Sequence, residues 1–135
     1  MPQIVLDENV HRKVKSLLQS WITVEQIGHE VGRSGMTDQN IIPGLLLEVK
    51  RVTFITHDER LYRRCHPHAG YCLIILPERS AAEVASFMRR LFRLQGFRTV
   101  RSRMGKVIQI TEHNVRWKEP RSPRERILSW PRKEK

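Results

Sequence analysis

The feature that most constrains the fold of this chain is the alternation of short apolar runs with segments of helical periodicity. Four runs favour strands, and they lie at Ile4–Leu6, Ile22–Ile27, Val52–Thr56 and Cys72–Leu76. The segments between them favour helices over 9–20, 38–49 and 58–64, and a fourth helix is expected after Ser80, a good N-cap. Strands that alternate with helices predict an α/β fold in which a mainly parallel central sheet is flanked by helices.

The C-terminal part of the chain departs from this alternation. Val107–Thr111 and Val115–Trp117 predict an antiparallel hairpin, and 98–106 alternates apolar and basic residues as a strand with one charged face would. The last residues are rich in Pro and Arg. We therefore predict one globular domain over 1–118 and a basic tail over 119–135. Aromatic and Arg residues in the tail suit the stacking of nucleic-acid bases, and a disordered extension or an element that pairs with a partner subunit is an equal alternative.

Composition narrows the class of protein. The chain of 135 residues has 39% hydrophobic and 29% charged side chains, which is typical of a globular domain. No apolar run approaches the roughly 20 residues that span a bilayer, and the first residues do not resemble a secretory signal. Two cysteines, Cys65 and Cys72, are too few for a disulfide framework. These observations predict a cytoplasmic protein that does not enter the membrane.

Positive charge is concentrated in the second half of the chain. Residues 1–58 hold six Lys/Arg and seven Asp/Glu, whereas residues 59–135 hold nineteen and seven, and the whole chain has a net charge of +11. Such an asymmetry favours a polyanionic partner such as a nucleic acid, and a solvated basic face or an acidic protein partner is the alternative. The arginines expected to contact the phosphate backbone are Arg89, Arg90, Arg93, Arg101 and Arg103.

Three aspartates occupy positions that suggest a metal site. Asp7 and Asp58 each follow a predicted strand, so both belong to the carboxyl edge of the sheet, where ligands of such folds bind. Asp38 begins a predicted helix that can face them. Three converging carboxylates suit Mg²⁺ or Mn²⁺, which activate water for phosphodiester hydrolysis. For each aspartate taken alone, capping of a helix is the better explanation, so the metal-site hypothesis rests on the combination of the three.

Several segments resemble the PIN-like nucleases, in particular the small prokaryotic group of toxin–antitoxin proteins. The similarity rests on IVLDEN at 4–9, GMTDQNI at 35–41 and FITHDERL at 54–61, and it extends through GYCLIILP at 70–77 to GKVIQITEHNVRW at 105–117. This resemblance implies a PIN-like three-layer fold and a metal-dependent endoribonuclease that acts as a toxin beside a small antitoxin protein. The implied substrate is RNA.

The resemblance also assigns roles to individual residues. Asp7, Asp38 and Asp58 match the acidic metal-binding positions, and Asn9 matches a position where an amide orients a carboxylate or a water molecule. The family pattern has a further acid where this chain has Arg60, and this departure predicts a single or weak Mg²⁺ or Mn²⁺ site. It also favours a second hypothesis, in which the fold is retained as an RNA- or protein-binding module with little or no catalysis.

Other candidates are weaker. His57 adjoins Asp58 and suits proton transfer, although a partly buried structural histidine is the simpler interpretation. The cysteine and histidine cluster over 65–72 matches no zinc-binding spacing. A phosphoacceptor domain would need a lysine at a late strand end, and Lys106 precedes its strand instead. The sequence leaves open whether the chain forms a homodimer.

Overall fold

A computed structural model of the chain describes residues 3–26 and 51–131, and they form an α/β fold built on one seven-stranded sheet. The strand order is β2-β1-β3-β4-β5-β6-β7. The first five strands in this order are parallel, and the last two are added antiparallel. The strands are β1 (Gln3–Leu6), β2 (Glu25–Gln26), β3 (Val52–Thr56), β4 (Tyr71–Ile75), β5 (Val107–Ile110), β6 (Asn114–Glu119) and β7 (Ser122–Ser129). The prediction of a mainly parallel α/β sheet is confirmed.

The central strands are apolar along their whole length because helices cover both of their faces. All five residues of β3 and all five of β4 are buried. Within β4, Cys72 and Ile74 belong to one hydrophobic cluster, whereas Tyr71, Leu73 and Ile75 belong to another. Successive side chains of a strand point to opposite faces, so these two clusters are the two sides of the sheet.

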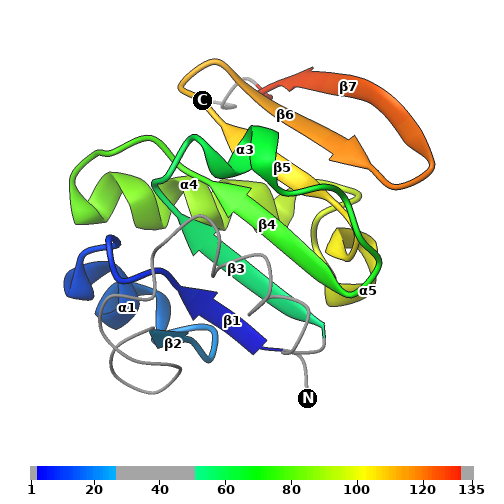
Figure 1. The fold of residues 1–135 in the computed structure, drawn as a ribbon. Helices are drawn as coiled ribbons and strands as arrows, with labels where there is room; N and C mark the ends of the chain where they lie inside the picture. The colour runs from blue at the N-terminus through cyan, green and yellow to red at the C-terminus, as the bar shows by residue number, and fades with distance from the viewer. Residues whose placement is uncertain (1–2, 27–50, 132–135) are drawn as a thin grey trace.

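Helices form the outer layers, as Figure 1 shows. The helices α1 (Arg12–Leu18) and α4 (Ala81–Arg93) pack against each other on one face, and α3 (Leu61–Arg64) lies on the opposite face. The predicted N-cap of α4 is confirmed, because Ser80 Oγ accepts a hydrogen bond from the backbone amide of Glu83. The helix expected over 38–49 lies outside the described residues. None of the helices in the described ranges is long and apolar enough to cross a membrane.

The prediction of a strand over 98–106 is wrong. This segment contains a short helix, α5 (Val100–Arg103). A capping box starts it: Thr99 Oγ1 accepts from the amide of Ser102, and Ser102 Oγ accepts from the amide of Thr99. The alternation of basic and apolar residues therefore reflects a capped helical turn and not one charged face of a strand.

The hairpin predicted near the C-terminus is confirmed, and the segment predicted as a tail extends it. β5 and β6 pair antiparallel, and β7 adds to β6 from within the range 119–135. Beyond β7, Trp130 Nε1 donates a hydrogen bond of 2.8 Å to the carbonyl of Thr111, and its ring stacks on Phe87 of α4. These contacts tie the end of the described chain to the body of the fold.

The topology fixes where a ligand site is expected. From β1 the chain passes to β2, which pairs with one edge of β1, and afterwards to β3, which pairs with the other edge of β1. In open α/β sheets, a crevice forms at such a switch point, outside the carboxyl ends of the strands. The segments that follow β1 and β3 begin with Asp7 and His57 respectively, so Asp7 and Asp58 both lie at this edge, where Asp58 lines the cleft and Asp7 is buried beneath it.

Candidate functional site

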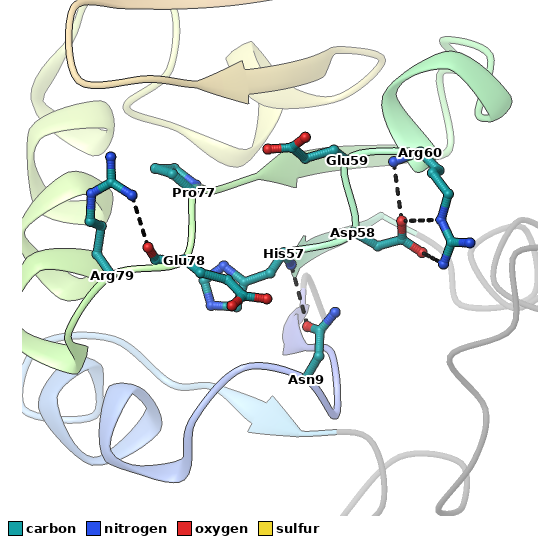
Figure 2. Close-up of a pocket in the computed structure, with 8 residues that line it drawn as sticks. All are labelled: Asn9, His57, Asp58, Glu59, Arg60, Pro77, Glu78 and Arg79. Carbon is teal, nitrogen blue, oxygen red and sulfur yellow. Dashed lines mark hydrogen bonds and ion pairs between the residues drawn. The ribbon is translucent and has the colours of Figure 1, made fainter.

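A cleft of about 610 Å³ lies at the carboxyl edge of the sheet. Segments that follow β1, β3 and β4 line it, and Figure 2 shows Arg60 and Arg79 on opposite sides with Asn9 and His57 between them. The residues that line the cleft are Asn9, His57, Asp58, Glu59, Arg60, Pro77, Glu78 and Arg79. The cleft is strongly polar, which suits a charged ligand.

Asp7 is the most unusual residue near this edge, because it is a fully buried carboxyl group with one oxygen unpaired. Its exposed fraction is 0%. Asp7 Oδ2 accepts a hydrogen bond of 2.6 Å from Thr56 Oγ1, and Oδ1 has no hydrogen-bond partner among the described residues. Burial raises the pKa of Asp7, hydrogen bonds from Thr56 and from the backbone of Glu8 oppose the increase, and the nearby charge of Asp58 adds to it. A buried carboxylate oxygen of this kind has the chemistry of a ligand for a hard divalent cation.

The hydroxyl of Thr56 connects the ends of β1 and β3. Besides donating to Asp7, Thr56 Oγ1 accepts a hydrogen bond of 3.0 Å from the backbone amide of Asp58. Asn9 Nδ2 lies 3.5 Å from the same oxygen. Thr56 therefore sets the spacing between the two aspartates, and the sequence-based interpretation overlooked it. The only signal for it was its position as the last residue of an apolar strand.

Asp58 is present at the predicted strand end, and an arginine neutralises it. Arg60 Nε lies 3.1 Å from Asp58 Oδ1, and Arg60 Nη2 lies 3.5 Å from Oδ2. The backbone amide of Arg60 also donates to Asp58 Oδ1. The side chain of Asp58 is 10% exposed, whereas that of Arg60 is 75% exposed. An exposed partner of this kind is weakly held, so a cation in the cleft can displace it.

Asn9 and His57 complete the polar floor of the cleft. Asn9 Oδ1 accepts a hydrogen bond of 3.3 Å from the backbone amide of His57, as Figure 2 shows. His57 Nδ1 lies 2.9 Å from the carbonyl oxygen of Leu76. A carbonyl oxygen only accepts hydrogen bonds, so Nδ1 carries the proton and Nε2 is the nitrogen that remains for other contacts. Asn9 thus contacts the site through the backbone of His57 and the hydroxyl of Thr56.

The described residues supply part of a ligand set for a single divalent cation. Asp7 supplies an unpaired buried oxygen, Asp58 a second carboxylate, and Asn9 an amide. Asp38, the third predicted ligand, lies outside the described residues. Within 3–26 and 51–131, no three His, Cys, Asp or Glu side chains are grouped closely enough to hold a metal ion. The described part of the site therefore contributes two of the three predicted carboxylates.

The predicted phosphate-binding arginines do not surround the cleft. Helix α4 starts near the carboxyl edge and runs back toward the amino edge, so Arg93 at its end and Arg101 in α5 lie toward the amino edge. Arg89, Arg93 and Arg101 are exposed. The guanidinium of Arg90 lies 4.4 Å from the centre of the Trp130 ring, so Arg90 has a packing contact as well. Arginines at the cleft itself are Arg60 and Arg79.

The prediction that Arg103 contacts the phosphate backbone is wrong, because its side chain is buried. Its exposed fraction is 4%, and Arg103 Nη1 donates hydrogen bonds of 3.0 Å to the carbonyls of Phe97 and Arg98. Its guanidinium also lies 4.2 Å from the centre of the Phe92 ring. Arg103 therefore stabilises the α4–α5 connection and is not available to a nucleic acid.

Two weaker candidates from the sequence, the cysteines and Lys106, lie at positions that do not suit the functions considered for them. Cys65 and Cys72 belong to the hydrophobic clusters on opposite faces of the sheet, and burial raises the pKa of Cys65 to about 11 and that of Cys72 to about 12. Lys106 precedes β5 at the amino edge, where Nζ donates to the carbonyl of Gly96. The lysine that a phosphoacceptor site needs is not among the residues that line the cleft.

Replacing Thr56 by Val is expected to destabilise the protein by about 2 kcal/mol, because a buried carboxylate then loses its hydrogen bond. Thr56→Ser keeps the hydroxyl and is the matched control, with a smaller expected loss. The free energy of unfolding, measured by urea denaturation, distinguishes the two variants. Equal losses for Val and Ser would show that the hydroxyl does not support Asp7.

Comparisons with known proteins add no relative: no family model, no curated protein and no solved structure matches this chain.

Proposed function

We propose that the chain is a metal-dependent endoribonuclease whose site is the carboxyl edge of the sheet between β1 and β3. The observation that carries the proposal is the buried Asp7 carboxyl group with its unpaired Oδ1, joined to Asp58 through the hydroxyl of Thr56. An oxygen-rich position of this kind suits Mg²⁺ or Mn²⁺. The resemblance to PIN-like nucleases in the same residues supports this choice of chemistry.

In this proposal Asp7 and Asp58 hold the cation, and Asp38 is the third ligand that the sequence predicts. A bound divalent cation lowers the pKa of water and neutralises charge on a phosphodiester. Thr56 and Asn9 keep the two strand ends in register. The guanidinium groups of Arg60 and Arg79 line the same cleft, where Arg60 pairs with Asp58 and Arg79 pairs with Glu112. A phosphate group would replace these carboxylate partners to form bidentate hydrogen bonds.

RNA is the proposed substrate because the resemblance implies it and because the net charge of +11 favours a polyanion. The same resemblance supports a role as the toxin of a toxin–antitoxin pair. The partner would then be a small protein that covers the cleft, and acidic side chains on that protein would complement Arg60 and Arg79.

A second candidate is an RNA-binding module without catalysis. The contact that favours it is the ion pair between Arg60 and Asp58, since a guanidinium already neutralises one of the two described carboxylates. In this case the cleft binds a phosphate group through Arg60 and Arg79 and leaves it intact.

Incubation with an unstructured, end-labelled RNA in Mn²⁺ or Mg²⁺ tests the proposal. We expect cleavage that EDTA abolishes and that Asp7→Asn lowers by about a hundredfold. The control is Glu8→Gln, which changes an exposed carboxylate next to Asp7. Cleavage that survives Asp7→Asn would contradict the assigned site, and RNA that is bound but never cut would favour the binding module.

A further inference from the structure

A basic surface lies at the edge of the sheet opposite the cleft. We define the amino-edge surface by the exposed residues Trp21, Arg89, Arg93, Arg98 and Arg101. Trp21 follows the end of α1, and the arginines lie in the second half of α4 and in the α5 region. Both α1 and α4 run from the carboxyl edge back toward the amino edge, so their ends meet there.

An exposed aromatic ring is fixed at the centre of this surface. Trp21 is 38% exposed, and its ring packs in a T-shaped contact on Phe92 of α4, with 5.8 Å between the ring centres. Phe92 is in turn held by the guanidinium of the buried Arg103. A tryptophan that is held in place and still accessible suits stacking against a planar ligand.

The arginines of the amino-edge surface are not neutralised by acidic side chains of the described residues. On α4, Arg89 lies one turn before Phe92, and Arg93 lies next to it in sequence. Arg98 Nε donates to the carbonyl of Arg93, which holds its side chain against the end of the helix. In the described part of the chain, Arg89, Arg93 and Arg101 form no ion pair, and no acidic residue occurs from Val84 to Thr111.

From this arrangement we propose that the amino-edge surface binds single-stranded RNA, with a base stacked on Trp21 and the flanking phosphates on the arginines. Stacking requires an unpaired base, and the face of a paired base is covered by its neighbours in a duplex. The inference deepens the proposed function, because it rests on RNA as the ligand and names the form of RNA that is bound.

The distance between the cleft and the amino-edge surface sets a minimum length for an RNA that occupies both. The 13 residues of α4 span about 20 Å. The cleft lies near the start of this helix and Trp21 lies near its end. A strand must therefore be long enough to cover this distance before it can occupy both sites, so short oligonucleotides are expected to bind one site at a time.

Fluorescence anisotropy with a labelled oligouridylate, measured in EDTA, tests the proposal without depending on cleavage. Trp21→Ala is expected to weaken binding between about fivefold and a hundredfold, and Trp21→Phe should retain most of the affinity. Arg93→Gln should reduce the slope of log affinity against log salt by about 0.7. Arg63→Gln removes an exposed charge from α3, on the opposite face of the sheet, and should bind like the unchanged protein.

The outcomes separate this inference from the proposed function. If Trp21→Ala binds RNA with unchanged affinity, the inference is wrong. If polyglutamate also displaces the RNA, the surface is instead a docking site for an acidic protein. If Trp21→Ala binds weakly while the unchanged protein never cleaves RNA, the inference stands and the nuclease proposal fails. Circular dichroism of each variant establishes that it is folded.

Discussion

Asp7→Asn should make the protein more stable while removing its response to metal ions. The buried carboxylate has one oxygen without a hydrogen-bond partner among the described residues and lies near the charge of Asp58, so its negative charge opposes folding near neutral pH. Asn removes the charge and still accepts the hydrogen bond from Thr56. We expect an increase of about 1 kcal/mol or more in the free energy of unfolding, and a rise of about 3 °C or more in melting temperature.

The pH dependence of this gain has a definite sign. Burial raises the pKa of Asp7 above its usual value of 3.8, so the folded state binds the proton more tightly than the unfolded chain does. The stability contributed by that proton is present below the unfolded pKa and is lost as pH rises through the folded pKa. The advantage of Asp7→Asn should therefore be small in acid and should grow to a plateau above the folded pKa.

Metal binding should make the unchanged protein more stable than Asp7→Asn, which reverses the order that they have in EDTA. A ligand that binds only the folded state at ten times its Kd adds about 1.4 kcal/mol of stability. Mn²⁺ should therefore raise the melting temperature of the unchanged protein and leave that of Asp7→Asn unaltered, with Glu8→Gln as the control. If Asp7→Asn is less stable in EDTA, then the carboxylate is a structural group. If Mn²⁺ stabilises both proteins equally, the ion binds elsewhere.

The sequence predicted the central sheet well because those strands are determined by burial. β3 was predicted with the bounds that it has, Val52–Thr56, since an apolar run covered on both faces is a strong local signal. The location of Asp7 and Asp58 at one edge also followed from topology, because parallel strands share a carboxyl edge. Neither conclusion required knowledge of a particular side-chain contact.

The errors arose where contacts between distant segments determine the structure. Arg103 looked like a member of a charged face, but two carbonyl groups and the ring of Phe92 hold its guanidinium inside the protein. β7 has a composition that is typical of a flexible tail, yet pairing with β6 and the anchoring of Trp130 make it a strand. The periodicity of the local sequence cannot predict contacts with such distant partners.

Arg60→Gln should increase the affinity for Mn²⁺ by roughly fivefold. In the present structure a cation must displace the Arg60 guanidinium from Asp58, and an exposed ion pair of this type contributes about 1 kcal/mol or less. Removing the guanidinium removes both the competition and the positive charge beside the site. Stability should fall by less than about 1 kcal/mol for the same reason.

Arg60→Asp tests the same site more strongly, because it adds a carboxylate where the PIN-like pattern has one. We expect a further gain in Mn²⁺ affinity and faster RNA cleavage, measured by calorimetric titration and by single-turnover cleavage. Arg63→Gln is the matched control for charge, since it removes an exposed arginine that does not line the cleft. Unchanged Mn²⁺ affinity in both Arg60 variants would exclude Asp58 as a ligand. A loss of RNA binding without any cleavage would instead assign Arg60 to phosphate recognition in a binding module, because the guanidinium would then be the group that contacts the ligand.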